Sequence, residues 1–479
     1  MAIRRTRGGA QLLVILMILS LVLTACGGGG TGGTNGEGTA PAAGGEGTTP
    51  AEAGEQGAAP AVTGTPDLAT GSGKAGTVTF WSWNTGGPEE QMAAAFNKAH
   101  PDVKLVIKSP EYTDYLNQLK LAMGSGRGPD VIGLQAGSMV KEYDEFLEDL
   151  APYAAKEWGN DWKGKFYSVG INQLLNGERA AALPWFNSAA GYVWYNKNIF
   201  DQHGLKPPKT FEELVSVSKQ LKAKGVTPFV HGAKDAWVNL DMYINLANEI
   251  APGKIYQAEA GKIPWTDPDL VRAMEHWKRL FDEGVIGRGA LATAQYPDAQ
   301  DKFFSGKSGM ILMGMWHDRD MTKAGLADRK KQYKLKEDII WMPVPFPDVN
   351  DDGKPGRLFG GPDVALGINA ESENKDAAWT FISWALSDEG QKFQGSALNF
   401  PALKGYGLDT SGAITPEQRA NLQQQVKDLE NAVGKRELLY PELDTALGDA
   451  LQNVATGEQT PQQAMEAVQS ESENIDRED

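Results

Sequence analysis

From Thr77 onward, short apolar runs rich in β-branched and aromatic residues alternate with longer segments whose patterning and start signals are helical. The short runs predict strands and the longer segments predict helices. Such alternation is typical of an α/β fold with largely parallel sheets. The predicted strands are Val78–Trp83, Val103–Lys108, Asp130–Leu134, Ala181–Phe186, Tyr192–Asn196, Gly309–Gly314 and Val364–Ile368.

Several helical segments open with residues that cap backbone amides. In a capping box, a Ser or Thr and a Glu or Gln three residues later satisfy each other's backbone N–H groups. Proline fits the first helical position, where its missing N–H costs nothing. These signals predict helices that start at Thr210, Asp267, Thr415 and Thr460. Ligands of open α/β sheets bind beyond the carboxyl ends of strands, so residues that follow strands are the first site candidates.

The first 25 residues differ from the rest. Three arginines precede an apolar stretch from Leu12 to Leu23, which is short for a membrane span and is laid out like a signal peptide. The stretch ends in Leu-Thr-Ala-Cys, which resembles the lipobox of bacterial lipoproteins. That resemblance implies cleavage before Cys26 and acylation of its thiol. An uncleaved anchor or an ordinary signal peptide is the alternative. In each case the remaining chain is expected outside the membrane.

Residues 26–76 are rich in Gly, Ala, Thr, Pro and Glu and hold no aromatic residue. Such a segment buries too little apolar surface to offset the entropy lost on ordering. It is therefore interpreted as a flexible tether, with a root-mean-square reach of roughly 40 Å for a Gly-rich coil of this length.

Composition narrows the class of protein. The formal net charge is −16, and it becomes −19 without the first 25 residues, which hold three arginines and no acid. Nucleic acid is therefore not expected as a partner, because phosphate binding needs clustered basic residues. Cys26 is the single cysteine, and the five histidines are widely spaced. No disulfide, zinc site or other cofactor is expected.

Several segments, in order, resemble the sugar-binding branch of the bacterial extracellular solute-binding proteins of ATP-driven (ABC) importers. They lie between Thr77 and Leu403 and are TVTFWSWN, GRGPDVIGLQ, the long block from Leu183 to Phe229, KFFSGKSGMILMGMW, FGGPDVALGIN and AAWTFISWALSDEGQ. The resemblance implies a type II periplasmic-binding-protein-like fold, with two hinge-linked α/β lobes, each a doubly wound, mostly parallel sheet. It places 77–187 and 342–384 in lobe 1, and 188–341 and 385–479 in lobe 2.

A sugar site needs aromatic planes for stacking and polar side chains for hydroxyl groups. Together with the resemblance, this predicts ligand contacts from residues that follow strands or flank the first crossing between lobes. Interlobe packing, core packing and tight turns are the alternative roles for the tryptophans and glycines. The candidates are Trp316, Trp83, Asn84, Trp185, Asn187, Trp237, Asp318, Gly361, Asp363 and Gln135, with Gly360, Glu111 and Tyr112 beside them.

Two further features have plainer interpretations. His231 and His317 lie beside candidate segments, but a lone histidine more often packs or hydrogen-bonds than binds a ligand. Asp348, Asn350 and Asp352 are spaced like the start of a calcium loop, yet the twelfth position is Phe359 rather than a bidentate Glu. A polar surface turn is the other interpretation of that segment.

The resemblance implies a monomeric binding protein, lipid-anchored through Cys26 on the outer side of the cell membrane, that captures a sugar and delivers it to an ABC permease with its cytoplasmic ATPase. The chain shows no Gly-x-Ser-x-Gly elbow, zinc motif or cysteine nucleophile, and it is not expected to be an enzyme. A sugar or glycerol phosphate, or another polar solute, is the alternative ligand. A carbohydrate-active enzyme and a receptor without import are the alternative functions.

Overall fold

The computed structural model describes residues 76–83, 89–354 and 356–477. The predicted signal peptide, the tether, Cys26 and Asn84 lie outside these ranges. The chain divides into two units, Met1–Thr63 and Gly64–Asp479, and every described residue belongs to the second.

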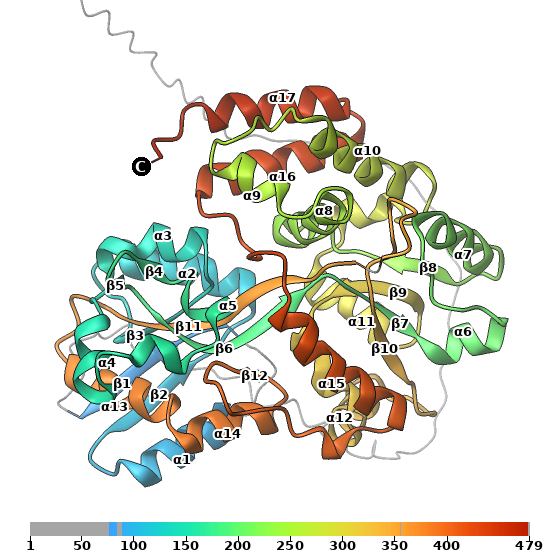
Figure 1. The fold of residues 1–479 in the computed structure, drawn as a ribbon. Helices are drawn as coiled ribbons and strands as arrows, with labels where there is room; N and C mark the ends of the chain where they lie inside the picture. Colours follow the sequence, from blue (N-terminus) through green and yellow to red (C-terminus); the bar gives the residue numbers. More distant parts are fainter. Residues whose placement is uncertain (1–75, 84–88, 355, 478–479) are drawn as a thin grey trace, which may run out of the picture. The chain divides into compact units, whose positions relative to one another are not determined.

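The first sheet has six strands in the order β12-β6-β11-β3-β1-β2 (Figure 1). β1 pairs in parallel with β2 and β3, whereas β11 pairs antiparallel with β3 and β6, and β12 pairs antiparallel with β6. The strands are β1 (Thr77–Trp81), β2 (Lys104–Lys108), β3 (Val131–Leu134), β6 (Leu183–Ala190), β11 (Phe359–Ile368) and β12 (Phe400–Pro401).

The second sheet has four strands in the order β10-β7-β9-β8. β7 pairs antiparallel with β10 and β9, and β8 pairs in parallel with β9. The strands are β7 (Tyr192–Asn196), β8 (Thr227–Val230), β9 (Ser308–Met313) and β10 (Trp341–Pro345). A short hairpin of β4 (Leu175–Asn176) and β5 (Arg179–Ala180) stands apart from both sheets.

Helices fill the connections between strands. Those before β7 are α1 (Glu89–Ala99), α2 (Tyr112–Gly124), α3 (Ser138–Tyr143), η1 (Asp144–Phe146), α4 (Ala151–Trp158), η2 (Trp162–Lys165) and α5 (Ser168–Ile171). Those between β7 and β10 are α6 (Lys197–His203), α7 (Phe211–Ala223), α8 (Ala236–Ile250), α9 (Lys254–Glu259), α10 (Pro268–Asp282), η3 (Arg288–Ala292), η4 (Gln295–Ala299), α11 (Gln300–Phe304), η5 (Met315–Met321) and α12 (Lys323–Tyr333). The later ones are α13 (Lys375–Ala385), α14 (Asp388–Ser396), η6 (Thr410–Gly412), α15 (Pro416–Glu430), α16 (Pro441–Thr456) and α17 (Pro461–Ser472).

The predicted helix starts are confirmed by the caps. Thr210, Asp267, Thr415 and Thr460 each accept a hydrogen bond from a backbone N–H in the first turn of the helix that follows. Among the described residues, no helix is long and apolar enough to cross a membrane.

Each of the seven predicted strands overlaps an observed strand. The β4–β5 hairpin escaped prediction, and so did three strands of the two sheets, β8, β10 and β12. All three lie at sheet edges and contain proline: Pro228 in β8, Pro343 and Pro345 in β10, and Pro401 in β12. Proline removes a ladder donor and is tolerated at an edge, so it hides edge strands from a pattern-based prediction.

The expectation of mostly parallel sheets is wrong, because both sheets are mixed. Two predicted boundaries between the lobes also need correction. β10 pairs with β7 in the second sheet, so the chain has not returned to the first sheet at residue 342. β12 pairs with β6, so residues 400–401 belong to the first sheet, although the prediction assigned all of 385–479 to lobe 2.

Two long strands join the hydrophobic cores of the two sheets. Leu183 and Phe186 of β6 pack in the core of the first sheet, whereas Ala190, at its end, packs in the core of the second. β11 behaves in the same way, with Phe359 in one core and Val364 in the other. Figure 1 shows β6 and β11 running side by side from the first sheet toward the second.

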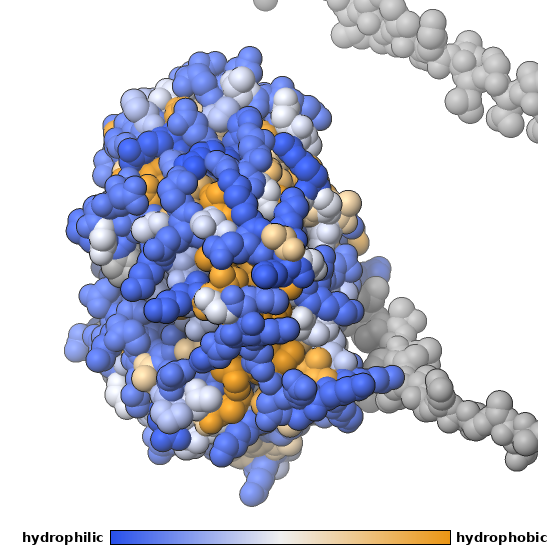
Figure 2. Space-filling model, turned by 90° about the vertical axis from the view of Figure 1, so that its right-hand side faces the viewer, coloured by the Kyte–Doolittle hydropathy of each residue, from blue (hydrophilic) through white to orange (hydrophobic). Residues whose placement is uncertain are grey.

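A separate helical layer lies over the second sheet. α8 packs with α10 and α16, and α16 packs with α17, so helices from the middle and the end of the chain share one core (Figure 1). The face in Figure 2 is mainly hydrophilic, and its hydrophobic areas are broken up by polar side chains.

Candidate binding cavity

A cavity of about 490 Å³ is lined by residues from elements of both sheets. Trp83 follows β1, Tyr112 begins α2, and Gln135 follows β3. Trp237 lies in the first turn of α8, and Trp316 lies in η5, directly after β9. The structure therefore brings together five side chains that are far apart in the sequence, as expected for residues beyond strand ends.

Aromatic rings form much of the lining. The Trp237 and Tyr296 rings are stacked, with centroids 5.7 Å apart and planes 21° apart. Trp316 meets Trp237 edge to face at 6.4 Å, and Tyr112 meets it at 6.2 Å. Trp83 packs edge to face on Tyr112 at 5.3 Å. Ring faces and edges of this kind suit the apolar face of a flat ligand.

Close backbone packing positions two of these rings. A Cβ at Gly314 would lie 2.0 Å from the Trp316 ring, so only glycine lets that ring fold back over the end of β9. The Asp235 carboxylate, at the N-cap of α8, accepts a hydrogen bond from the backbone N–H of Gln295 at 2.7 Å. This contact fixes Trp237, two residues later, beside Tyr296.

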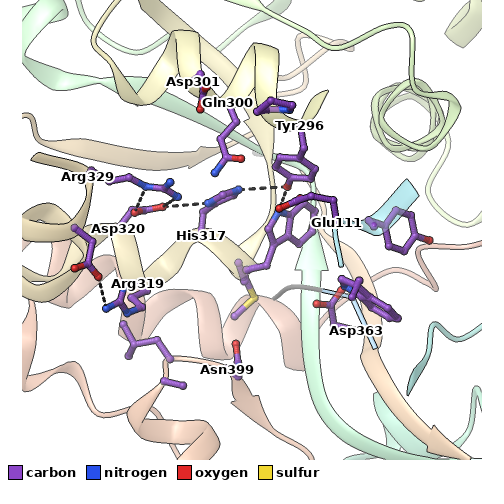
Figure 3. Close-up of a pocket in the computed structure, with 18 of the residues that line it drawn as sticks. Glu111, Tyr296, Gln300, Asp301, His317, Arg319, Asp320, Arg329, Asp363 and Asn399 are labelled. Atoms are coloured by element: carbon purple, nitrogen blue, oxygen red, sulfur yellow. Dashed lines mark hydrogen bonds and ion pairs between the residues drawn. The ribbon is translucent and has the colours of Figure 1, made fainter. Parts of the chain in front are cut away.

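A bulge in β11 presents Asp363. Pro362 pairs with Asn187 and Val364 pairs with Phe186, so Asp363 has no partner in the β6–β11 ladder. A bulge bends its strand and changes the direction of a side chain. Asp363 lines the cavity (Figure 3), and burial raises its pKa, although the charge of Arg436 opposes that shift.

Arg436 is the central charged group. Its Nε and Nη2 each donate to the Asp241 carboxylate at 3.0 Å, and Nη1 donates to Asp363 at 3.4 Å. With the Gln135 amide oriented so that its oxygen accepts from Nη1 at 2.7 Å, its nitrogen donates to the Tyr112 hydroxyl and to Glu437. The guanidinium also lies 4.3 Å from the Trp316 ring centroid, a cation–π distance.

Two more arginines line the cavity from the side of η5 and α12. Arg329 donates from Nε and Nη2 to the two Asp320 oxygens at 2.8 and 3.0 Å. Arg319 pairs with Asp328 at 2.6 Å (Figure 3). Each of the three lining arginines is thus engaged by a carboxylate of the protein. The lining also holds five acids, namely Glu111, Asp301, Asp320, Asp328 and Asp363, so its formal charge is negative.

Four predicted ligand residues do not line the cavity, and the prediction that they face it is wrong. Trp185 is buried in the core of the first sheet against Phe80 and Phe186. The Asn187 amide donates to the Pro401 carbonyl, which ties β6 to β12.

Asp318 and Gly361 are the other two. Asp318 is 1 % exposed, and burial raises its pKa well above the usual range. Gly361 packs against the Gln173 side chain, which donates to the carbonyl of Gly360. Asp318 lies in the helical turn η5, and the bulge at Asp363 changes the facing of β11 relative to Gly361.

Tyr296, Arg329 and Arg436 were not among the predicted ligand residues. Tyr296 and Arg436 belong to segments without regular secondary-structure signals, and Arg329 sits in a Lys- and Arg-rich helix that looks like a solvated surface. Nothing in their local sequence distinguished them. Long-range pairing with Asp241, Asp320 and Asp363 gives the two arginines their places.

The candidate calcium segment forms a hydrogen-bonded turn. The Asp348 carboxylate accepts from the backbone N–H groups of Asn350 and Gly353. Asn350 accepts from Arg272, and Asp352 pairs with Lys354. Within the described ranges, no group of three or more His, Cys, Asp or Glu residues is arranged to hold a metal ion.

The fold and the cavity define a two-lobed solute-binding protein of the periplasmic type. The family model for bacterial extracellular solute-binding proteins matches residues 81–392, and the chain belongs to this family. A maltose-bound protein from T. maritima shares the fold, with a TM-score of 0.67 and 21% identity, over 83% of this chain and 99% of the other. The expected α/β two-lobed fold is therefore confirmed.

Two curated relatives differ in ligand. The maltotriose-binding protein of Pyrococcus abyssi is 28% identical over 341 residues, which are 67% of this chain and 64% of the relative. The chain thus spans less than two thirds of that relative's length. The sn-glycerol-3-phosphate-binding periplasmic protein of Salmonella typhimurium is 22% identical over 82% of this chain and 90% of its own length.

Proposed function

We propose that this chain is an extracellular solute-binding lipoprotein that captures a neutral mono- or oligosaccharide between its lobes and delivers it to an ABC-type permease. The observation that carries the proposal is the cavity lined by Trp83, Tyr112, Trp237, Tyr296 and Trp316. Pyranose rings have apolar faces that stack on such planes, and the polar groups between the rings suit hydroxyls.

The charges of the cavity favour a neutral ligand over a phosphate. A phosphate site needs guanidinium or ammonium groups with free donors. Here Arg436 is held by Asp241 and Asp363, and Arg329 is held by Asp320. A phosphate would have to displace these carboxylates and approach further acids. Glycerol 3-phosphate, which the Salmonella relative's name gives as its ligand, is therefore the weaker candidate.

No catalytic chemistry is required of this site. Ligand that contacts both lobes stabilises their closed arrangement, so binding acts as a shift between conformations. β6 and β11 pass between the two cores and are the expected hinge strands. The closed form is then the one that the permease and its ATPase recognise.

The anchor belongs to the same proposal. Acylation of Cys26 would hold a monomeric protein on the outer side of the membrane. Replacement by Cys26→Ala is expected to abolish incorporation of labelled palmitate and to release the protein into the medium. Palmitate labelling that persists in this variant would contradict the anchor while leaving the binding function intact.

Thermal melting followed by intrinsic fluorescence tests the ligand class. The purified protein is melted with maltose, maltotriose, xylotriose, chitotriose and glycerol 3-phosphate in separate arms. A ligand at a hundred times its dissociation constant adds roughly 2.7 kcal/mol of stability. We expect a saccharide to raise the melting temperature by a few degrees and glycerol 3-phosphate to leave it unchanged.

The variant Trp316→Ala should abolish the saccharide shift, since truncation of a central aromatic anchor commonly costs about 2 kcal/mol or more of binding free energy. Trp379→Ala is the matched control, because Trp379 lies on α13 and bonds Glu157 away from the cavity. A shift with glycerol 3-phosphate alone would overturn the neutral-sugar assignment. Equal saccharide shifts in the protein and in Trp316→Ala would show that this cavity is not the site.

A further inference from the structure

A continuous hydrogen-bonded series runs behind the aromatic lining (Figure 3). Trp316 Nε1 donates to the Tyr296 hydroxyl at 2.8 Å, and that hydroxyl lies 3.3 Å from His317 Nε2. His317 Nδ1 lies 3.1 Å from Asp320 Oδ2, and Arg329 forms the bidentate pair with Asp320. The series therefore links a cavity-lining indole to a buried ion pair.

The chemistry of its members sets the direction of the series. An indole N–H only donates, so the Tyr296 oxygen accepts from Trp316 and its own hydrogen is free to donate. The acceptor within reach is His317 Nε2, which must then be unprotonated. The proton of a neutral imidazole consequently sits on Nδ1 and donates to Asp320. The N–H and O–H hydrogens of Trp316, Tyr296 and His317 are all used when His317 is neutral.

The surroundings of His317 support the neutral form. The His317 side chain is 7% exposed, and burial lowers its pKa, against the opposing pull of Asp320. Aromatic rings of three elements surround the imidazole, namely Trp194 of β7, Phe304 of α11 and Trp316 of η5. The titratable or charged groups around it are Asp320, Asp318 and Arg319 on its own element, Arg329 on α12 and Tyr296 on η4.

Most of these neighbouring groups are either paired with an opposite charge or favoured in their neutral form. Hydrogen bonds from His317 and Arg329 lower the pKa of Asp320 even though burial acts the other way, so this carboxylate stays ionised. Burial raises the pKa of Asp318 well above its usual range. Arg319 pairs with Asp328. If His317 were protonated, its positive charge and that of Arg329 would therefore share one carboxylate, that of Asp320.

We propose that His317 and Asp320 are positioning residues for the ligand-facing aromatic wall of Trp237, Tyr296 and Trp316, and that protonation of His317 releases this wall. The neutral series fixes the Trp316 plane under Arg436 and keeps Tyr296 stacked on Trp237. It also consumes the polar hydrogens of Trp316 and Tyr296, so the wall offers ring faces to the ligand rather than extra donors. This inference rests on the proposed function.

Protonation of His317 would exchange donor and acceptor in the bond between His317 Nε2 and the Tyr296 hydroxyl. With hydrogen on Nε2, the imidazolium donates to the Tyr296 oxygen, which already accepts from Trp316. The phenol hydrogen then has no acceptor in the series and must turn toward the cavity. Binding of a ligand that needs the stacked wall should weaken as the pH falls through the region below about 6.5, the ordinary value for histidine.

The test combines a measurement without ligand and one with ligand. Two-bond ¹H–¹⁵N NMR of the intact protein, labelled at histidine and tryptophan, reports the His317 tautomer and the Trp316 indole N–H between pH 8 and 4.5. Affinities for maltose and maltotriose are measured over the same range. Tyr296→Phe removes only the linking hydroxyl, and His317→Gln keeps an amide near the Nε2 position but removes the titration. Tyr243→Phe is the matched control, because it removes a buried phenol hydroxyl that bonds Leu270 away from the cavity.

We expect a neutral Nδ1–H tautomer that titrates below the ordinary histidine value, and a higher value in Tyr296→Phe because a bond to the neutral ring is lost. Loss of one buried hydrogen bond corresponds to roughly fivefold to tenfold weaker saccharide binding at pH 7.5. The wild-type affinity should fall by a similar factor toward pH 4.5, whereas both site variants should give flatter profiles. Tyr243→Phe should keep the wild-type profile.

Two results would overturn the positioning role. One is an Nε2–H tautomer, or titration at or above the ordinary value. The other is saccharide affinity in Tyr296→Phe that equals the wild type at every pH. Failure of the proposed function looks different: neither sugar binds, while the tautomer is as expected and the Trp316 indole resonance moves in Tyr296→Phe but not in Tyr243→Phe. That outcome supports the series as the device that positions the wall.

Discussion

Two buried arginines face the same cavity from different sides, and their surroundings differ in one respect. The Arg329 side chain is 16% exposed and the Arg436 side chain 14% exposed, and each forms a bidentate pair with an aspartate. Arg329 meets one carboxylate, Asp320, which it shares with neutral His317. Arg436 meets Asp241 and Asp363 and lies near Glu437, which in turn has Asp444 as a charged neighbour.

The pKa values of the carboxyl groups reflect this difference in the number of carboxylates that each guanidinium serves. The pKa of Asp320 is lowered, because its bonds to His317 and Arg329 outweigh burial. The pKa values of Asp241 and Asp363 are raised, because burial outweighs their share of Arg436. Burial and the neighbouring Asp444 raise the pKa of Glu437 to about 8.

One guanidinium is thus enough to keep one buried carboxylate ionised but not several. The Arg329 side of the cavity should keep its charges from mildly acid to alkaline pH, apart from the histidine. The Arg436 side should change its protonation near neutral pH. Variants that each remove one charged group test this contrast between the Arg329 side and the Arg436 side of the cavity.

The largest effect is expected from Arg436→Met. The change leaves Asp241 and Asp363 buried without their cation, and loss of one partner of a buried pair typically costs about 3–5 kcal/mol. Urea unfolding at pH 7.5 measures the loss. A loss below about 1 kcal/mol would show that the cluster is effectively neutral without its arginine.

Arg329→Met should cost less, about 3 kcal/mol at pH 8, because it leaves one carboxylate without its cation rather than two, and Asp320 keeps its contact with His317. Without Arg329 the pKa of His317 rises. A folded-state value above the unfolded one stabilises the protein below the unfolded value, so the loss should shrink toward pH 5.5. The same urea unfolding at the two pH values checks this. A loss independent of pH would mean that His317 does not exchange a proton in response.

Glu437→Gln should show a third, smaller effect with a defined pH dependence. Because the folded pKa is raised above that of the unfolded chain, the acid costs stability as the pH rises from about 4.5 toward 8. The amide removes that cost, so the variant should be more stable than the wild type by roughly 1 kcal/mol or more at pH 8 and similar at pH 5. Melting curves at both pH values suffice. A variant less stable at pH 8 would assign Glu437 an ionised, stabilising role.

Arg319→Ala should have the smallest effect. Its pair with Asp328 lines the same cavity, but the two side chains are 42% and 61% exposed. Exposed pairs contribute about 0–1 kcal/mol, and salt screens them. Unfolding in 0.05 and 0.5 M NaCl should give nearly equal values for the variant and the wild type at high salt. A loss as large as that of Arg329→Met would remove burial as the explanation of the contrast.

Local signals predicted much of the fold. The capping residues Thr210, Asp267, Thr415 and Thr460 begin helices as expected, and the central strands follow their apolar runs. Within the described residues, the failures concentrate where a rule depends on position in the sheet. Proline hid the edge strands, and the alternation of strands and helices wrongly indicated mostly parallel sheets, because it does not fix the direction in which neighbouring strands pair.

The predicted site residues show the same difference between what local sequence indicates and what position in the fold decides. Trp83, Gln135, Trp237, Trp316 and Asp363 line the cavity, and their ligand contacts remain predictions. Trp185 and Asn187 were named for their place beside the crossing, but Trp185 packs in the core and Asn187 bonds the Pro401 carbonyl of β12. Both faces of β6 are buried there, so its sequence did not indicate which side chains reach the cavity.

By itself, the sequence determined which residue types are available and where the chain forms helices and central strands, because caps, prolines and apolar periodicity act over a few residues. The tertiary structure alone decided that Arg436 meets Asp241 and Asp363, that a bulge presents Asp363, and that Trp316 reaches Asp320 through Tyr296 and His317. Apart from the His317–Asp320 bond, which spans three positions, the side-chain contacts join residues 20 to 195 positions apart. Their energies depend on burial, which is a property of the folded chain and not of any segment.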